Sequence, residues 1–240
     1  MKKFSWDARL RRAEQLASAY LFAAEILRFY LPLARFQKEL DRHLRASCKP
    51  AANSVENSAL RQPLDLPLLL PRFSPFLSVI ASAAPSPLAQ LSRDLLQEGS
   101  GAWSVLLADY WKTGQRSESM AENPRLFFPR AFLQPYAEFL AEHTAASVTG
   151  PAPRLCPVCG GLPQCGVLRQ EGDGAKRSLL CSLCATEWDY RRIVCPACEK
   201  AGRLYRRRIQ TPSPGSLRHL PRLHHHRGSH PGRLRRSRRR

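Results

Sequence analysis

An uninterrupted apolar run long enough to cross a membrane is missing from this chain. Six prolines, counted from Pro63 to Pro87, interrupt its most apolar region, residues 64–91, whereas a membrane helix needs about 20 consecutive apolar residues. Charged residues follow the first six positions, so the start lacks the apolar core of a secretory signal. Arg11-Arg12 is also not followed by the apolar stretch of a twin-arginine export signal. We therefore expect a cytoplasmic protein whose cysteines are reduced.

The residue sets that enzymes use are missing as well. The sequence has no glycine-rich phosphate loop, and no serine, histidine and aspartate are spaced in a way that supports a catalytic triad. Its thiols fall mostly in pairs whose spacing suits a metal ion, so they are expected to be ligands and not nucleophiles. We therefore expect a protein that is not an enzyme.

Acidic residues are scarce, with 19 Asp and Glu against 38 Lys and Arg and a formal net charge of +19. Residues 201–240 contain 13 arginines and no acidic residue, which leaves only +6 on the first 200 residues. This basic tail has no apolar periodicity and is rich in Arg, Pro, His, Gly and Ser, so we expect it to be disordered. Two origins are open, a natural basic arm for nucleic acid or an out-of-frame translation of a GC-rich gene.

Three Cys-x-x-Cys pairs are the most specific signal in the chain: Cys156 with Cys159, Cys181 with Cys184, and Cys195 with Cys198. Two intervening residues let one tight turn aim both sulfurs at a point about 2.3 Å away, the length of a metal–thiolate bond. Gly160 follows the first pair, where such a turn needs a residue that tolerates positive φ. We predict metal binding by all six cysteines, with the first two pairs forming a Cys₄ site.

The 21 residues between Cys159 and Cys181 suit a β-hairpin that turns at Gly172-Asp-Gly174, with strands near 167–168 and 178–180. Each turn that carries two cysteines is called a knuckle here. We expect the Trp188 ring to cover one of these knuckles. Cys165 is expected to be a packed thiol and Cys48 a free one. Dithiol redox chemistry and structural disulfides are weaker alternatives, and spacing does not choose between zinc and iron.

The region before the cysteines has helical periodicity. We predict a helix over residues 4–46 that is kinked or broken at Pro32, a connecting loop over 47–75, and further helices at 76–84, 87–97, 102–111 and 130–145. The fold class is therefore an α-helical N-terminal domain followed by a small rubredoxin-like or zinc-ribbon-like domain and a disordered basic tail. The expected boundaries are residues 1–147, 155–200 and 201–240.

The chain resembles the formate dehydrogenase accessory protein family FdhE in three motifs, residues 155–160, 177–188 and 192–199. The second of these, in which Thr-Glu-Trp follows Cys-Ser-Leu-Cys and an arginine precedes the next Cys-Pro-x-Cys, is not general to zinc ribbons. A weaker likeness extends to residues 134–138 and to the helical region, so that the resemblance covers roughly residues 1 to 200.

The resemblance implies a cytoplasmic factor needed to make active respiratory formate dehydrogenase, one that binds the catalytic subunit of that enzyme before export and is associated with rubredoxin-like iron. It also implies four Cys-x-x-Cys pairs and two Cys₄ sites, and the fourth pair is absent here. Histidines between His219 and His230 could complete a site with Cys195 and Cys198, but the 20-residue loop to His219 exceeds the usual spacing of about 12–15. The alternatives are a zinc-ribbon protein that binds nucleic acid through its Arg-rich tail and a dithiol oxidoreductase.

Overall fold

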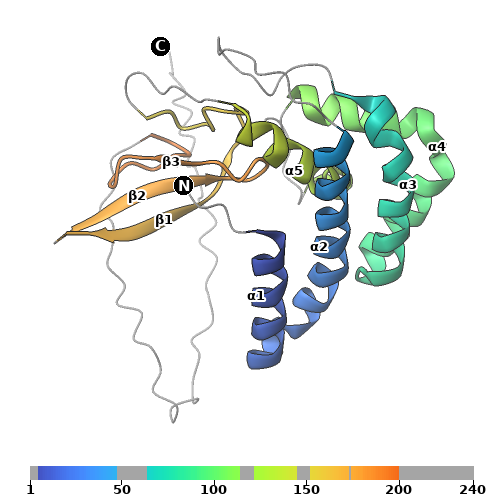
Figure 1. The fold of residues 1–240 in the computed structure, drawn as a ribbon, viewed down its shortest axis with the longest axis horizontal. Helices are drawn as coiled ribbons and strands as arrows, with labels where there is room; N and C mark the ends of the chain where they lie inside the picture. The colour runs from blue at the N-terminus through green and yellow to red at the C-terminus, as the bar shows by residue number, and fades with distance from the viewer. Residues whose placement is uncertain (1–4, 48–63, 114–121, 145–151, 173, 200–240) are drawn as a thin grey trace, which may run out of the picture. The chain divides into compact units, whose positions relative to one another are not determined.

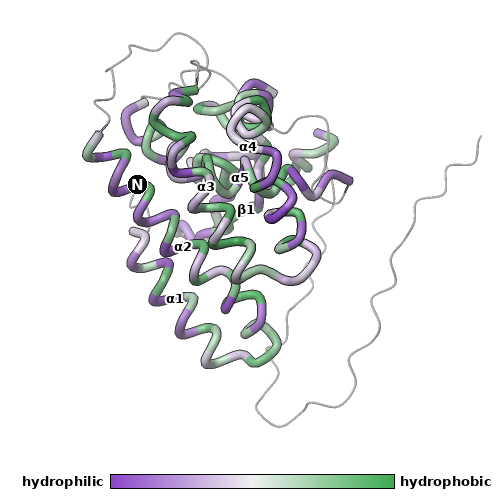
Figure 2. Tube along the Cα trace, turned by 90° about the vertical axis from the view of Figure 1, so that its right-hand side faces the viewer, coloured by the Kyte–Doolittle hydropathy of each residue, from purple (hydrophilic) through white to green (hydrophobic). Residues whose placement is uncertain are grey.

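The computed structural model describes residues 5–47, 64–113, 122–144, 152–172 and 174–199. Two long helices come first, α1 (Trp6–Ala19) and α2 (Leu21–Ser47), and they lie side by side in opposite directions (Figure 1). The Ser5 hydroxyl accepts a hydrogen bond from the Ala8 N–H at 3.3 Å, which caps α1. Hydrophilic and hydrophobic residues alternate along both helices (Figure 2), as amphipathic helices require.

The break within the predicted first helix occurs at Tyr20 and not at Pro32. Tyr20 has extended dihedral angles, φ −130° and ψ 98°, and its N–H still bonds to the Leu16 carbonyl at 2.9 Å. Pro32 lies inside α2. The prediction of a kink or break at Pro32 was wrong. Proline disfavours a helix locally, but the neighbouring residues Leu33 and Ala34 are buried in α2, and this packing stabilises the helix through Pro32.

The next two helices are α3 (Leu66–Ala83) and α4 (Ser86–Thr113). The predicted loop is therefore wrong for residues 66–75, while residues 48–63 lie outside the described part. Three prolines of α3 are spaced four residues apart, at Pro67, Pro71 and Pro75, and all three are exposed. The carbonyls that lose a backbone partner thus lie on the side that faces away from the core, where they are open to solvent.

Helix α3 has the length and apolar composition of a membrane span, the only described helix that does. The prolines do not exclude this, because they do not interrupt the helix. Five of its residues are instead fully buried in the protein core: Leu69, Phe73, Phe76, Leu77 and Ile80. A core helix of a bundle meets the same criteria of length and apolarity.

Helix α4 contains an irregularity at Gly99, whose φ of 78° and ψ of 178° are not helical. This agrees with the prediction of two separate helices at 87–97 and 102–111. A short 3₁₀ turn (Pro124–Leu126), capped by the Asn123 side chain, leads into α5 (Phe127–Glu142). The helical core is centred on aromatic rings, with Phe132 of α5 at 4.9 Å from Phe73 and 5.3 Å from Phe76 between ring centroids.

After the helices, an antiparallel three-stranded sheet has the order β1 (Pro163–Glu171), β2 (Gly174–Cys181) and β3 (Glu187–Asp189). The predicted hairpin is present with longer strands than expected, and its turn includes Gly172 at φ 55°. Strand β3 was not predicted, because three residues are too few to show a period. Trp188 of β3 is buried and donates its ring N–H to the Pro153 carbonyl at 2.9 Å, just before the first knuckle.

Candidate metal centre

Two of the three cysteine pairs form knuckles at the base of the hairpin. In the first, the Gly160 N–H bonds to the Cys156 carbonyl at 2.8 Å and Gly160 has the expected positive φ of 67°. In the second, Cys181 ends β2, and Ala185 after Cys184 also has a positive φ, of 53°. Each pair of sulfurs is thus aimed by a tight turn whose exit residue is left-handed.

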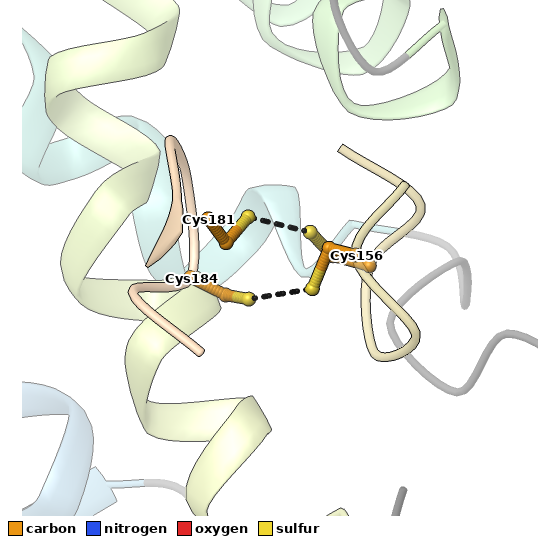
Figure 3. A group of neighbouring side chains, drawn as sticks. Cys156, Cys181 and Cys184 are labelled. Carbon is orange, nitrogen blue, oxygen red and sulfur yellow. Dashed lines mark hydrogen bonds between the residues drawn. The ribbon is translucent and has the colours of Figure 1, made fainter. Parts of the chain in front are cut away.

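The structure brings four of the six predicted ligands together. The sulfurs of Cys156, Cys159, Cys181 and Cys184 all lie within 4.8 Å of one another. The Cys156 and Cys184 sulfurs are 3.5 Å apart, and these side chains point toward one another from separate segments (Figure 3). The Cys159 and Cys181 sulfurs are 3.3 Å apart. A tetrahedral ion with bonds of about 2.3 Å would separate its sulfurs by about 3.8 Å, so the donor set fits one such ion.

Burial and shared protons shape the chemistry of these thiols. A hydrogen bond from Cys159 is the main cause that lowers the pKa of Cys156, and the same contact raises the pKa of Cys159. One thiolate is stabilised by its protonated neighbours, because four thiolates so close together would repel one another. A divalent cation removes that repulsion and takes the place of the shared protons, which is why such clusters bind metal.

Neighbouring groups complete the surroundings of the sulfurs. The backbone N–H groups of Gly161 and Leu183 donate to the Cys159 and Cys181 sulfurs, each at 3.4 Å. A Cβ atom on Gly161 would lie 3.2 Å from the Cys159 sulfur, so glycine keeps this approach open. The cluster therefore has N–H donors directed at thiolates, which stabilises the negative charge that four cysteines bring to a metal ion.

The helical region also contributes to the site. Tyr110 of α4 is buried, and burial raises the pKa of its hydroxyl, with smaller effects from the positive charge of Arg130 and the negative charges of Cys159 and Cys181. Cys156, Cys181 and Cys184 belong to the same buried cluster as Leu107 and Tyr110. Tyr110 and Arg130 were not predicted from the sequence, since neither lies in a recognisable motif and both are distant from the cysteines along the chain.

The third pair stands apart from this cluster. Cys195 and Cys198 are exposed and belong to no group of three or more potential ligands among the described residues. Cys165 lies on β1 and is exposed, so the expectation of a packed thiol was wrong. Alternate residues of an outer strand point away from the core, and only burial on both faces would have packed it. Cys48 and His219–His230 lie outside the described residues.

Comparison with known proteins gives a consistent result. Residues 155–192 match the family model described as FdhE, central domain. The chain is similar to the protein FdhE homolog of Pseudomonas aeruginosa, with 51% identity over 51 residues that make up 21% of this chain and 16% of that protein. It is also similar to protein FdhE of Escherichia coli, with 38% identity over 52 residues, or 22% and 17% of the two chains.

The fold is similar to the crystal structure of the FdhE protein from Pseudomonas aeruginosa, with a TM-score of 0.55 and 25% identity over 82% of this chain and 70% of that chain. In sequence, however, the match spans only 16% and 17% of the length of the two curated relatives. The matched part contains the four clustered cysteines. These findings agree with the motifs in the sequence on a likeness to FdhE and on a cysteine-rich region that suits a metal ion.

Proposed function

We propose that this chain belongs to the FdhE family and is a non-catalytic cytoplasmic factor that binds the catalytic subunit of respiratory formate dehydrogenase and is needed to form the active enzyme. The observation that carries the proposal is the match of residues 155–192 to the central domain of FdhE, because that segment supplies the clustered thiols. The names of the relatives support an accessory role. The binding of the catalytic subunit is the finer part of the proposal.

Cys156, Cys159, Cys181 and Cys184 are the proposed ligands of one Zn²⁺ or Fe ion, and Cys195 and Cys198 are proposed as further ligands. When bound, the ion supplies a cross-link between the first two knuckles. With the knuckles cross-linked, the buried cluster that Cys156, Cys181 and Cys184 share with Leu107 and Tyr110 of α4 joins the sheet to the helices. Thiolates that are all metal ligands are not nucleophiles, which supports a role in binding and not in catalysis.

An exposed apolar surface on the helices suits the binding of a partner. Tyr20, Leu21, Phe22 and Ile26, here called the apolar corner, lie where α1 and α2 join. Leu21 and Phe22 are 87% and 86% exposed, and the Tyr20 and Phe22 ring centroids are 5.7 Å apart. Large apolar side chains gathered at one exposed site mark interaction surfaces more often than isolated ones do.

A binding measurement tests the proposal. The full chain, loaded with Zn²⁺, is immobilised and the catalytic subunit of formate dehydrogenase from the same organism is passed over it. We expect specific binding that Phe22→Glu weakens at least tenfold, because a charge at the centre of an apolar contact is desolvated without a partner. Gln15→Glu is the matched control, since Gln15 is exposed on α1 and lies outside the apolar corner.

The two parts of this proposal fail separately. If the unaltered chain does not bind the catalytic subunit, the proposed function is wrong. If it binds and Phe22→Glu binds equally well, the function stands and the apolar corner is not the contact surface. Equal losses in Phe22→Glu and Gln15→Glu would show that negative charge anywhere on these helices is sufficient, which also excludes a specific apolar contact.

A further inference from the structure

The outer edge of strand β1 carries backbone groups without partners. The sheet order β1-β2-β3 leaves β1 at an edge (Figure 1), and seven of its nine residues are exposed. Strand β1 pairs with β2 along one side, and no other segment of the described chain forms a hydrogen bond with the backbone of residues 163–171. Such an edge is a template for another strand, because its N–H and C=O groups lie in an unpaired row.

The alternation of the ladder identifies the residues whose backbone groups point outward. Glu171 and Gly174 form the pair that closes the two-residue turn, and a closing pair of this kind exchanges both of its backbone hydrogen bonds. Counting back along β1, every second residue bonds to β2, and the residues between them direct both groups away from it. The outward residues are Gly166, Leu168 and Gln170.

The middle of this edge lacks the features that normally prevent the addition of a strand. Proteins protect exposed edges with charged side chains, prolines or bulges. A proline and a register shift lie at the start of β1, within residues 163–165, and Arg169 and Glu171 lie near its end. Residues 165–168 carry no charge, and the Leu168 side chain is 60% exposed. The centre of β1 is therefore open to an added strand.

Arg177 of β2 holds a second chain segment beside this edge. Arg177 is opposite Leu168 in the ladder. A Cβ atom on Gly166 would lie 3.2 Å from the Arg177 Nε atom, so glycine leaves room for the guanidinium. The Nη1 atom of the same guanidinium donates to three carbonyls within residues 191–194, at 2.7, 3.3 and 3.3 Å. One planar group therefore links β1 to this segment.

The segment that Arg177 holds is basic and apolar on its exposed side. Arg191 and Arg192 are exposed, and no ion pair within the described chain involves either of them. Ile193 between them is 58% exposed. Arg169, the cation of β1 itself, is already paired with Glu187. Two available guanidinium groups beside apolar side chains favour a ligand that brings carboxylates and apolar groups.

From these features we propose that β1 accepts an extended acidic segment of a partner protein as a further strand of the sheet. The outward groups of Gly166, Leu168 and Gln170 bond to the backbone of that segment, which is a recurring mode of peptide recognition. An apolar residue of the segment covers Leu168, and its carboxylates pair with Arg191 and Arg192. The proposal goes beyond the accessory role and does not depend on it, because the contact uses neither the apolar corner nor the clustered cysteines.

The test uses the full chain, loaded with Zn²⁺, and the fluorescein-labelled peptide Asp-Thr-Val-Thr-Val-Thr-Asp as the probe. Fluorescence anisotropy measures binding, and NMR follows the hydrogen exchange of each backbone amide. We expect saturable binding that slows exchange at Gly166, Leu168 and Gln170. The amides of Val167 and Arg169, which bond to β2, should exchange slowly with or without the peptide. The same peptide N-methylated at its five central residues should bind at least tenfold more weakly, because it has lost the donors of the ladder.

Two sets of variants locate the contact. Leu168→Glu and Val105→Glu form a matched pair, because each replaces an apolar side chain that is 60% exposed, on β1 and on α4. Leu168→Glu should weaken binding at least tenfold, because a charge at the centre of an edge opposes strand addition, and Val105→Glu should not weaken it. Slow exchange at Val167 in Leu168→Glu shows that its ladder with β2 is intact. The double variant Arg191→Glu/Arg192→Glu should prefer the peptide in which lysine replaces each aspartate.

Several results would overturn the proposal. One is the absence of binding by the acidic peptide, and another is equal binding by its N-methylated form. Slowed exchange that leaves out Gly166, Leu168 and Gln170 would place the peptide elsewhere on the chain. Equal losses in Leu168→Glu and Val105→Glu, or an unchanged charge preference in Arg191→Glu/Arg192→Glu, would also contradict it.

Discussion

Replacing Arg9 with alanine should destabilise the helical region more than any other single charge deletion among the described ion pairs. Arg9 of α1 donates to both carboxylate oxygens of Glu138 in α5, at 2.9 and 2.7 Å, and their side chains are only 19% and 5% exposed. Removal of one partner from a buried pair leaves the other charge desolvated, which costs about 3–5 kcal/mol. With a urea m-value of about 2 kcal/mol/M, a loss of about 4 kcal/mol lowers the unfolding midpoint by about 2 M.

Arg35→Ala is the matched control, because Arg35 also pairs across two helices, with Glu14 at 3.1 Å, but both side chains are at least half exposed. Its expected cost is about 0.2–1 kcal/mol. Urea unfolding of the Zn²⁺-loaded chain, followed by circular dichroism at 222 nm, measures both variants. In a Glu138→Gln background, Arg9→Ala should cost only about 1 kcal/mol, since no buried charge is then left unpaired. Equal losses from Arg9→Ala and Arg35→Ala would refute the reasoning.

Two more outcomes concern the metal and the tail. Purified protein should carry close to one tightly held metal ion per chain. Either Cys156→Ser or Cys181→Ser should remove the ion and increase amide hydrogen exchange across residues 155–198, because such sites are folded by their metal. Full retention of the ion in these variants would contradict the ligand set. Deletion of residues 201–240 should leave the helical circular dichroism unchanged and abolish any nucleic-acid binding, because that tail carries 13 arginines. Salt-resistant binding by residues 1–200 would instead favour a folded nucleic-acid surface.

The cysteine spacing predicted the clustering of four cysteines well because the signal is local. A Cys-x-x-Cys turn followed by a left-handed residue needs no distant partner to adopt its shape, and Gly160 indicated one of these turns directly. The hairpin was predictable for the same reason, from Gly172 and the residues around it. The pairing of the first and second knuckles also followed from the sequence, since a hairpin of this length returns the chain to its base.

The failures arose where distant contacts outweigh local preference. A proline every four residues normally marks a loop, yet in α3 these prolines share the exposed face while Phe73 and Phe76 are buried on the other. No pattern in a single sequence shows that the Phe132 ring of α5 packs against Phe73 and Phe76. The contact between Arg9 and Glu138 joins residues 129 positions apart, so its existence could not be read from spacing.

The position of the four clustered cysteines within the core has a physical consequence for the whole described chain. A Cys₄ ion is a negative charge of about −2 that apolar surroundings would not tolerate without nearby dipoles and cations. Two N–H groups of the ribbon supply part of this stabilisation. Tyr110 of α4 lies in the same buried cluster as Cys156, Cys181 and Cys184, and the negative charges of Cys159 and Cys181 act on its hydroxyl. The helices therefore do more than precede the ribbon in sequence, because they provide part of the environment in which its thiolates can be buried.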